Sequence, residues 1–188
     1  RLDVLLSQDQ PRPGSLPAIK NLLTDKKNAN YFFSSLDKES WLIPLQEDGF
    51  FDPTSAPPKS EEAPNPDYWH SIKYLLTIST KVEKEEKDLL KKIIDNIMDA
   101  YVRGDIDLHP HTITEITQVF INLDNFSFGV SEKLFFEAYS KKTLHYSWTL
   151  VHSELSQHLA KKLLDKGDKE GLLNLLDYFF GFATYEEA

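Results

Sequence analysis

The sequence predicts an all-α protein, and three observations support this prediction. Apolar residues recur at helical spacing along most of the chain, most clearly between Glu83 and Val102. No segment alternates apolar and polar residues convincingly at the period of two that a half-buried strand requires. Residues that start or stop helices border several of the periodic stretches. We therefore expect roughly eight or nine helices in antiparallel succession, joined by short links.

Two helical architectures fit this pattern: a HEAT/ARM-like α-solenoid of stacked antiparallel pairs, or a closed helical bundle. Helix pairs recur at roughly 40-residue intervals, first over Glu83–Leu123 and then over Ser131–Leu164. We favour the solenoid because wide apolar faces suit a helix that contacts both its partner and the next pair. The domain would span residues 1–188. Because the chain begins with Arg1 rather than Met, we expect it to be a fragment of a longer protein.

The sequence pattern of the N-terminal part predicts short helices and one loop. Helices are expected at Leu16–Leu23, at residues 28–36 and at residues 40–49, where Pro44 falls in the first turns and costs little. From residue 51 to residue 66 the chain is rich in Pro, Ser and Glu, which predicts a surface loop.

A helix from about Asp67 to Lys81 follows, and then the strongly periodic helix Glu83–Val102. Gly104 comes just after this helix, where a glycine stop is expected. Thr112 and Glu115 have the spacing of a capping box that starts the next helix, which ends near Leu123. Three further helices are expected at Ser131–Tyr139, Leu144–Lys166 and Leu172–Phe180.

Composition excludes several classes of function. The 188 residues are 40% hydrophobic and 12% aromatic, enough for a sizeable core. A net charge of −9 disfavours a broad nucleic-acid surface and an anionic membrane surface. Basic residues for a local nucleic-acid patch are few: Lys26, Lys27, Lys141, Lys142, Lys161 and Lys162. The absence of cysteine excludes disulfides and thiolate metal sites, and no apolar run is long enough to span a bilayer. We expect a cytoplasmic protein.

The stretch "GDIDLHPHT" contains the one candidate for metal chemistry. Asp105, Asp107, His109 and His111 alternate with other residues, so an extended backbone would place all four side chains on one side. Carboxylate and imidazole are suitable ligands for a metal ion, which could support a hydrolase. Asp and His are also ordinary in a loop between two helices. We favour the structural loop and predict no metal, cofactor or catalytic residue.

Aromatic residues flank the Pro-rich loop and offer a candidate protein-binding groove: Trp41, Phe50, Phe51, Tyr68 and Trp69. In the alternative interpretation, these side chains pack the first helices against each other and hold the loop in place.

The sequence from Asn28 to about residue 80 also carries a resemblance. Its matching residues are Tyr31, Phe32, Phe33, Leu36, Trp41, Leu45, Gly49, Phe50, Phe51, Tyr68, Trp69, Tyr74 and Leu75. In this pattern the chain resembles HEAT-like helical N-terminal regions of large bacterial multidomain proteins. The resemblance implies a helical-repeat region beside an effector or nucleotide-handling domain, in a defence or stress-response protein. It carries over no catalytic residue.

Three functions follow, in order of preference. The first is a non-catalytic scaffold that binds a protein partner or a neighbouring domain of its own chain. The second is a metal-dependent hydrolase that uses the Asp/His loop. The third is nucleic-acid binding, which the acidic balance disfavours. The sequence does not predict the oligomeric state.

Overall fold

A computed structural model describes residues 2–59, 65–123 and 148–183 of the chain. Within these ranges the structure is all-helical, without strands, which confirms the predicted fold class. None of the helices there combines the length and apolar character that a bilayer crossing needs. The α-helices are α1 (Leu2–Leu6), α2 (Leu16–Leu22), α3 (Lys26–Ser35), α4 (Leu42–Glu47), α5 (Ser71–Ile78), α6 (Lys84–Arg103), α7 (Pro110–Asn122), α9 (Trp148–Lys166) and α10 (Lys169–Ala183), with 3-10 helices η1 (Glu39–Trp41) and η2 (Pro53–Ser55).

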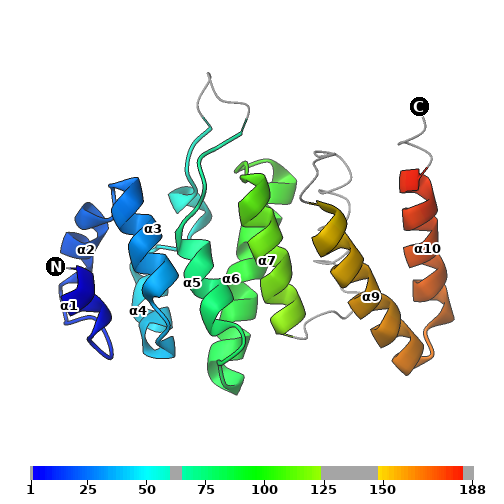
Figure 1. Cartoon of the computed structure of the whole chain (residues 1–188), viewed down its shortest axis with the longest axis horizontal. Coiled ribbons are helices and arrows are strands. Elements are labelled where there is room, and N and C mark those ends of the chain that lie inside the picture. The colour runs from blue at the N-terminus through cyan, green and yellow to red at the C-terminus, as the bar shows by residue number, and fades with distance from the viewer. Residues whose placement is uncertain (1, 60–64, 124–147, 184–188) are drawn as a thin grey trace.

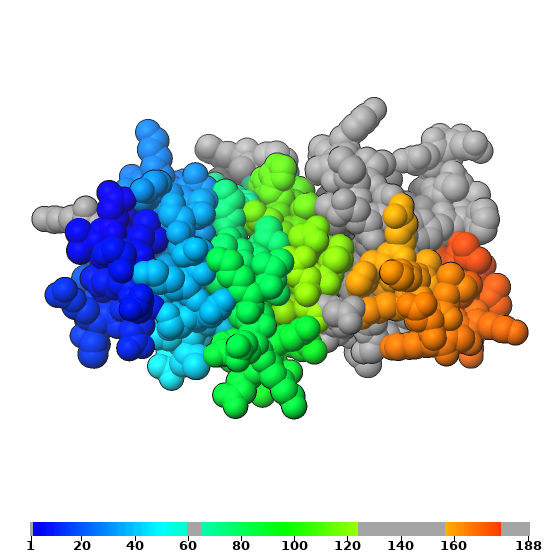
Figure 2. Space-filling model, turned by 60° about the horizontal axis from the view of Figure 1, so that its bottom comes forward, coloured from blue at the N-terminus to red at the C-terminus, as the bar shows by residue number. Residues whose placement is uncertain are grey.

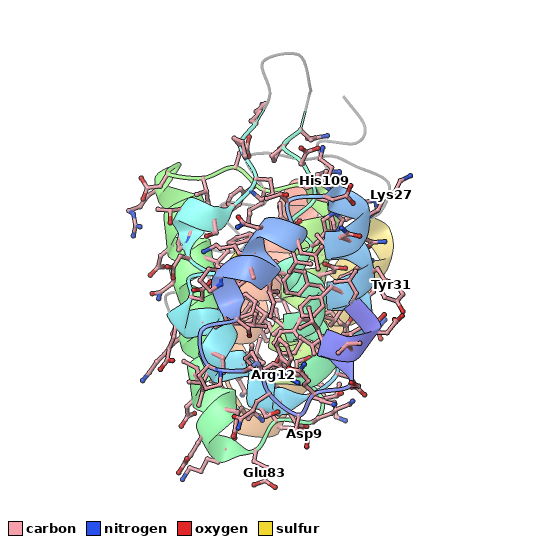
Figure 3. All side chains as sticks on the ribbon, turned by 90° about the vertical axis from the view of Figure 1, so that its left-hand side faces the viewer. Asp9, Arg12, Lys27, Tyr31, Glu83 and His109 are labelled. Atoms are coloured by element: carbon pink, nitrogen blue, oxygen red, sulfur yellow. The ribbon has the colours of Figure 1, made fainter. Side chains whose placement is uncertain are left out.

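The helices follow one another in chain order along the longest axis of the molecule, from α1 at one end to α10 at the other (Figure 1). The space-filling view shows the same order along an elongated body (Figure 2). Helices α1, α3, α5, α7 and α9 contact one another in series, and α9 also contacts α10. An end-on view shows side chains filling the space between the helices (Figure 3).

Local chemistry fixes several of the helix ends. Gly104 adopts a φ of 82°, and its N–H donates to the Tyr101 carbonyl while Asp105 N–H donates to the Ala100 carbonyl. This pair of bonds is a Schellman motif, which needs the left-handed residue that glycine supplies without strain. At the start of α3, the Asp25 carboxylate accepts from the N–H groups of Lys27 and Asn28.

Several helix starts differ from the prediction. Helix α3 begins at Lys26 rather than at residue 28, and α10 begins at Lys169 rather than at Leu172. Helix α5 begins at Ser71 rather than near Asp67, and in the segment before it the Trp69 N–H donates to the Thr112 hydroxyl. Helix α7 begins at Pro110, with His109 as its N-cap, so the predicted Thr112/Glu115 capping box is wrong. The Pro110 ring favours the first helical position, where no N–H is needed.

Helix α1 has no counterpart in the sequence prediction. Its five residues are too few to show a period of their own, and none of them is fully buried. Leu2, Leu5 and Leu6 pack against the core from the surface. The helix predicted at Ser131–Tyr139 and the first residues of the one predicted at Leu144–Lys166 lie outside the described ranges.

One continuous apolar core runs through the described helices, from Ile19 in α2 to Leu175 in α10. Its densest part is aromatic: Phe32 makes edge-to-face contacts with Phe33 and with Trp41, at centroid distances of 5.2 and 5.6 Å. Within the loop predicted over residues 51–66, the described part contains the 3-10 helix η2, and Phe51 and Pro66 at its two ends are buried.

Candidate functional site

The four residues of the candidate metal loop do not converge in the structure. The Asp105 carboxylate pairs with the Arg103 guanidinium at 2.8 Å, and Asp107 pairs with the Lys59 ammonium at 3.6 Å. Among the described residues, no group of three or more His, Asp or Glu side chains is arranged to hold a metal ion. The two aspartates therefore engage cations of the protein itself.

The two histidines of this loop shape the start of α7. His109 lies in the extended region, with φ −63° and ψ 140°, and its Nδ1 accepts a 3.1 Å hydrogen bond from the His111 N–H. The His109 and His111 rings stack, with centroids 5.2 Å apart. An imidazole nitrogen therefore takes the role that an Asp, Asn or Ser oxygen usually takes at an N-cap.

Four of the five aromatic candidates for a protein-binding groove lie inside the molecule. Trp41, Phe50, Phe51 and Trp69 are buried, with at most 7% of each side chain exposed. They pack the first helices together, as the alternative interpretation predicted, and do not present a surface to a partner. Tyr68 is the member of the set that reaches the surface.

Tyr68 joins the two candidate sets at one place in the fold. Its ring meets the His70 ring edge-on at 4.9 Å and the His109 ring edge-on at 6.1 Å. Its hydroxyl donates to the Glu115 carboxylate of α7. We call these residues, with two neighbours, the Tyr68 cluster: Tyr68, His70, Lys73, His109, His111 and Glu115. Figure 3 shows His109 and Lys27 toward the top of the view and Glu83 at the bottom.

The hydrogen bond between Tyr68 and Glu115 is partly buried, and burial shifts the pKa of both groups. Burial raises the pKa of Glu115, which the Tyr68 hydroxyl and the Lys73 ammonium partly offset. Burial, followed by the hydrogen bond to Glu115, raises the pKa of Tyr68 far above its ordinary value. Tyr68 is consequently a permanent donor, and it stabilises the carboxylate form of Glu115.

His70 and Lys73 complete the cluster on its α5 side. Burial lowers the pKa of His70, and the charges of Lys73 and Lys26 lower it further, whereas Asp67 raises it. The Lys73 ammonium lies 5.5 Å from the centre of the Tyr68 ring. It also reaches across to α3, where it donates to Asn30 at 3.1 Å and Ser34 at 3.3 Å. The cluster thus links α3, α5 and α7.

Sequence reasoning missed the role of Thr112 and Glu115. The Thr112 hydroxyl is buried and accepts from the Trp69 N–H at 3.3 Å, and the Glu115 carboxylate accepts from the Tyr68 hydroxyl. One signal for this was available: both polar residues lie near the α7 stripe formed by Ile116 and Val119. A polar residue buried beside an apolar stripe needs a hydrogen-bond partner.

A second surface feature lies on the last helix pair. Leu164 in α9 and Leu173 and Leu176 in α10 are 64%, 61% and 43% exposed. Leu173 and Leu176 are one turn apart and so share a helix face. Of the basic candidates, Lys26 and Lys27 belong to α3 and Lys161 and Lys162 to α9, whereas Lys141 and Lys142 lie outside the described ranges.

Comparison of the chain with protein-family models, with curated proteins and with solved structures finds no match.

Proposed function

We propose that the chain is a non-catalytic helical-repeat module, an α-solenoid that binds a protein partner or a neighbouring domain of its own chain. One observation carries the proposal: α1, α3, α5, α7 and α9 contact one another in series along the long axis. An array of this kind has an extended surface in proportion to its length, and helical repeats use such surfaces for binding.

The exposed leucines support the same proposal. Contiguous apolar surface on a protein often binds other proteins. Here Leu173 and Leu176 are exposed on α10, while Leu175 between them is buried in the core. Helix α10 therefore has apolar residues on its inner and its outer face, which is typical of a helix that packs against a partner on each side.

The proposal is tested with a double variant, Leu173→Asp/Leu176→Asp, and a matched control, Val4→Asp. Val4 is 61% exposed on α1 at the opposite end of the row. The wild-type chain, purified under gentle conditions from the cells that encode it, is expected to carry a protein or domain at fixed stoichiometry. The double variant should lose it, and Val4→Asp should keep it.

Unfolding midpoints equal to that of the wild type in both variants would show that neither change acts through stability. Retention of the partner by the double variant would move the binding surface away from α10. A wild-type chain that carries no partner at any concentration tested would overturn the proposed function.

A further inference from the structure

We propose that the first turn of α7 is an acid-sensitive joint: protonation of His109 breaks the cap that holds this turn and releases the Tyr68–Trp69 segment from α7. The proposal does not depend on the proposed binding function. It rests on one hydrogen bond, from the His111 N–H to His109 Nδ1 at 3.1 Å. A backbone N–H can only donate, so Nδ1 must be without a proton for the cap to exist.

A proton on His109 also meets an unfavourable electrostatic setting. The imidazolium would lie at the N-terminus of a 13-residue helix, which carries the positive end of the helix dipole. His111 stacks on it from the same helix. From the segment before α5, Tyr68 presents its ring and Asp67 its negative charge. Burial and His111 lower the pKa of His109, and Asp67 opposes them.

The capped turn holds two residues of the preceding segment. The Thr112 hydroxyl accepts from the Trp69 N–H, and Glu115 accepts from the Tyr68 hydroxyl. Trp69 belongs to the apolar core. Loss of the cap leaves the His111 N–H without its acceptor, and fraying of this turn moves the acceptors that hold Tyr68 and Trp69. The joint between α5 and α7 opens at this end as a result.

The direction of the pH dependence follows from the protonation of each state. The pKa of His109 is lowered in the folded chain, so the unfolded chain binds more protons between that pKa and the ordinary value of 6.5. Stability is therefore full at pH above 6.5 and falls as the pH drops through this window. His70 acts in the same direction, with its own lowered pKa. Glu115 has a raised pKa, so its protonation opposes the loss at lower pH.

Amide hydrogen exchange of the full chain tests the proposal. The protection factors of Ile113, whose N–H donates to the His109 carbonyl, and of Trp69 are measured at pH 7.5 and 5.5. Both should fall by about fivefold, the ratio that corresponds to the loss of one N-cap hydrogen bond. The Ala29 amide in the Asp25-capped helix α3 is the internal control and should not change.

Two kinds of variant separate His109 from its neighbours. His109→Asn keeps a side-chain oxygen at the N-cap and does not titrate, so it should remove most of the pH response and leave only the smaller contribution of His70. His111→Gln and His70→Gln each remove one other histidine and should leave most of the response in place. Protection at Ile113 that is equal at both pH values in the wild type would overturn the proposal without any variant. The same fall in His109→Asn as in the wild type would also overturn it.

Discussion

Trp41 precedes the Pro-rich loop in the sequence and Tyr68 follows it. The aromatic core around Trp41 and the Tyr68 cluster nevertheless stabilise the fold in different ways. Phe32, Phe33 and Trp41 are buried, and Phe32 touches each of the other two edge-to-face. Tyr68 and His109 also touch edge-to-face, but at the surface and beside a carboxylate. Burial of apolar area does not depend on pH, whereas a hydrogen bond to a titratable group does. Aromatic composition alone therefore does not reveal which kind of contact a region makes.

The largest effect is expected from truncation of the aromatic core. Trp41→Ala should lower the free energy of unfolding by about 3–5 kcal/mol, because it leaves a cavity beside Phe32. The change also removes the 3.2 Å hydrogen bond from the indole N–H to the Gln8 carbonyl. Denaturation in urea measures the loss. Ile43→Ala, two residues away and 52% exposed, is the control and should cost much less. Equal losses would contradict the core assignment.

A smaller effect that depends on pH is expected in the Tyr68 cluster. Tyr68→Phe removes the donor to Glu115 and should cost about 1.5–3 kcal/mol at pH 7.5, as for hydrogen bonds to charged groups. Removal of the donor raises the pKa of Glu115 further, so the loss should shrink as falling pH protonates this carboxyl. Chemical denaturation at several pH values measures this dependence.

A double-mutant cycle and a control sharpen this prediction. In a Glu115→Gln background, Tyr68→Phe should cost less, because no carboxylate is left without its donor. Tyr31 is exposed and donates to Asp3 at 2.7 Å, so Tyr31→Phe is a matched control with a much smaller loss. A loss from Tyr68→Phe that is the same in the wild-type and in the Glu115→Gln background would show that the two residues are not coupled.

The hydrogen bond from the Trp69 N–H to the Thr112 hydroxyl should contribute less to the free energy of unfolding than the bond between Tyr68 and Glu115. Thr112→Val keeps the shape of the side chain but leaves the buried Trp69 N–H without its acceptor, at a cost of about 1–2 kcal/mol. The hydroxyl of Thr114 bonds instead to the Pro110 carbonyl of its own helix at 3.0 Å. Thr114→Val is therefore the control, and its loss measured by thermal or urea denaturation should be smaller. The reverse order would contradict the link from α7 to Trp69.

The smallest effect on stability is expected at the surface. Asp67 pairs with Lys26 at 2.7 Å and both side chains are exposed, so Asp67→Asn should cost at most about 1 kcal/mol. It should nevertheless lower the pKa of His70 and of His109, because Asp67 raises both. NMR titration of the ring protons measures these shifts. Asp37→Asn, in the exposed pair with Lys81, should leave both histidines unchanged.

Local signals in the sequence determined the helical content and several helix ends. The period of α6 and the stop at Gly104 were both readable, because each depends on neighbours within a few residues along the chain. The aromatic residues were recognised as a group, but only their burial decided between a core and a binding groove.

Only the tertiary structure decided the start of α5, the start of α7 and the composition of the Tyr68 cluster. Thr112 and Glu115 have a spacing that fits a capping box, yet their partners are Trp69 and Tyr68, more than 40 positions earlier in the chain. The local pattern therefore suggested a local partner for each side chain. The packing of α5 against α7 instead brought a distant donor within reach, and a buried polar group bonds to the partner that packing brings to it.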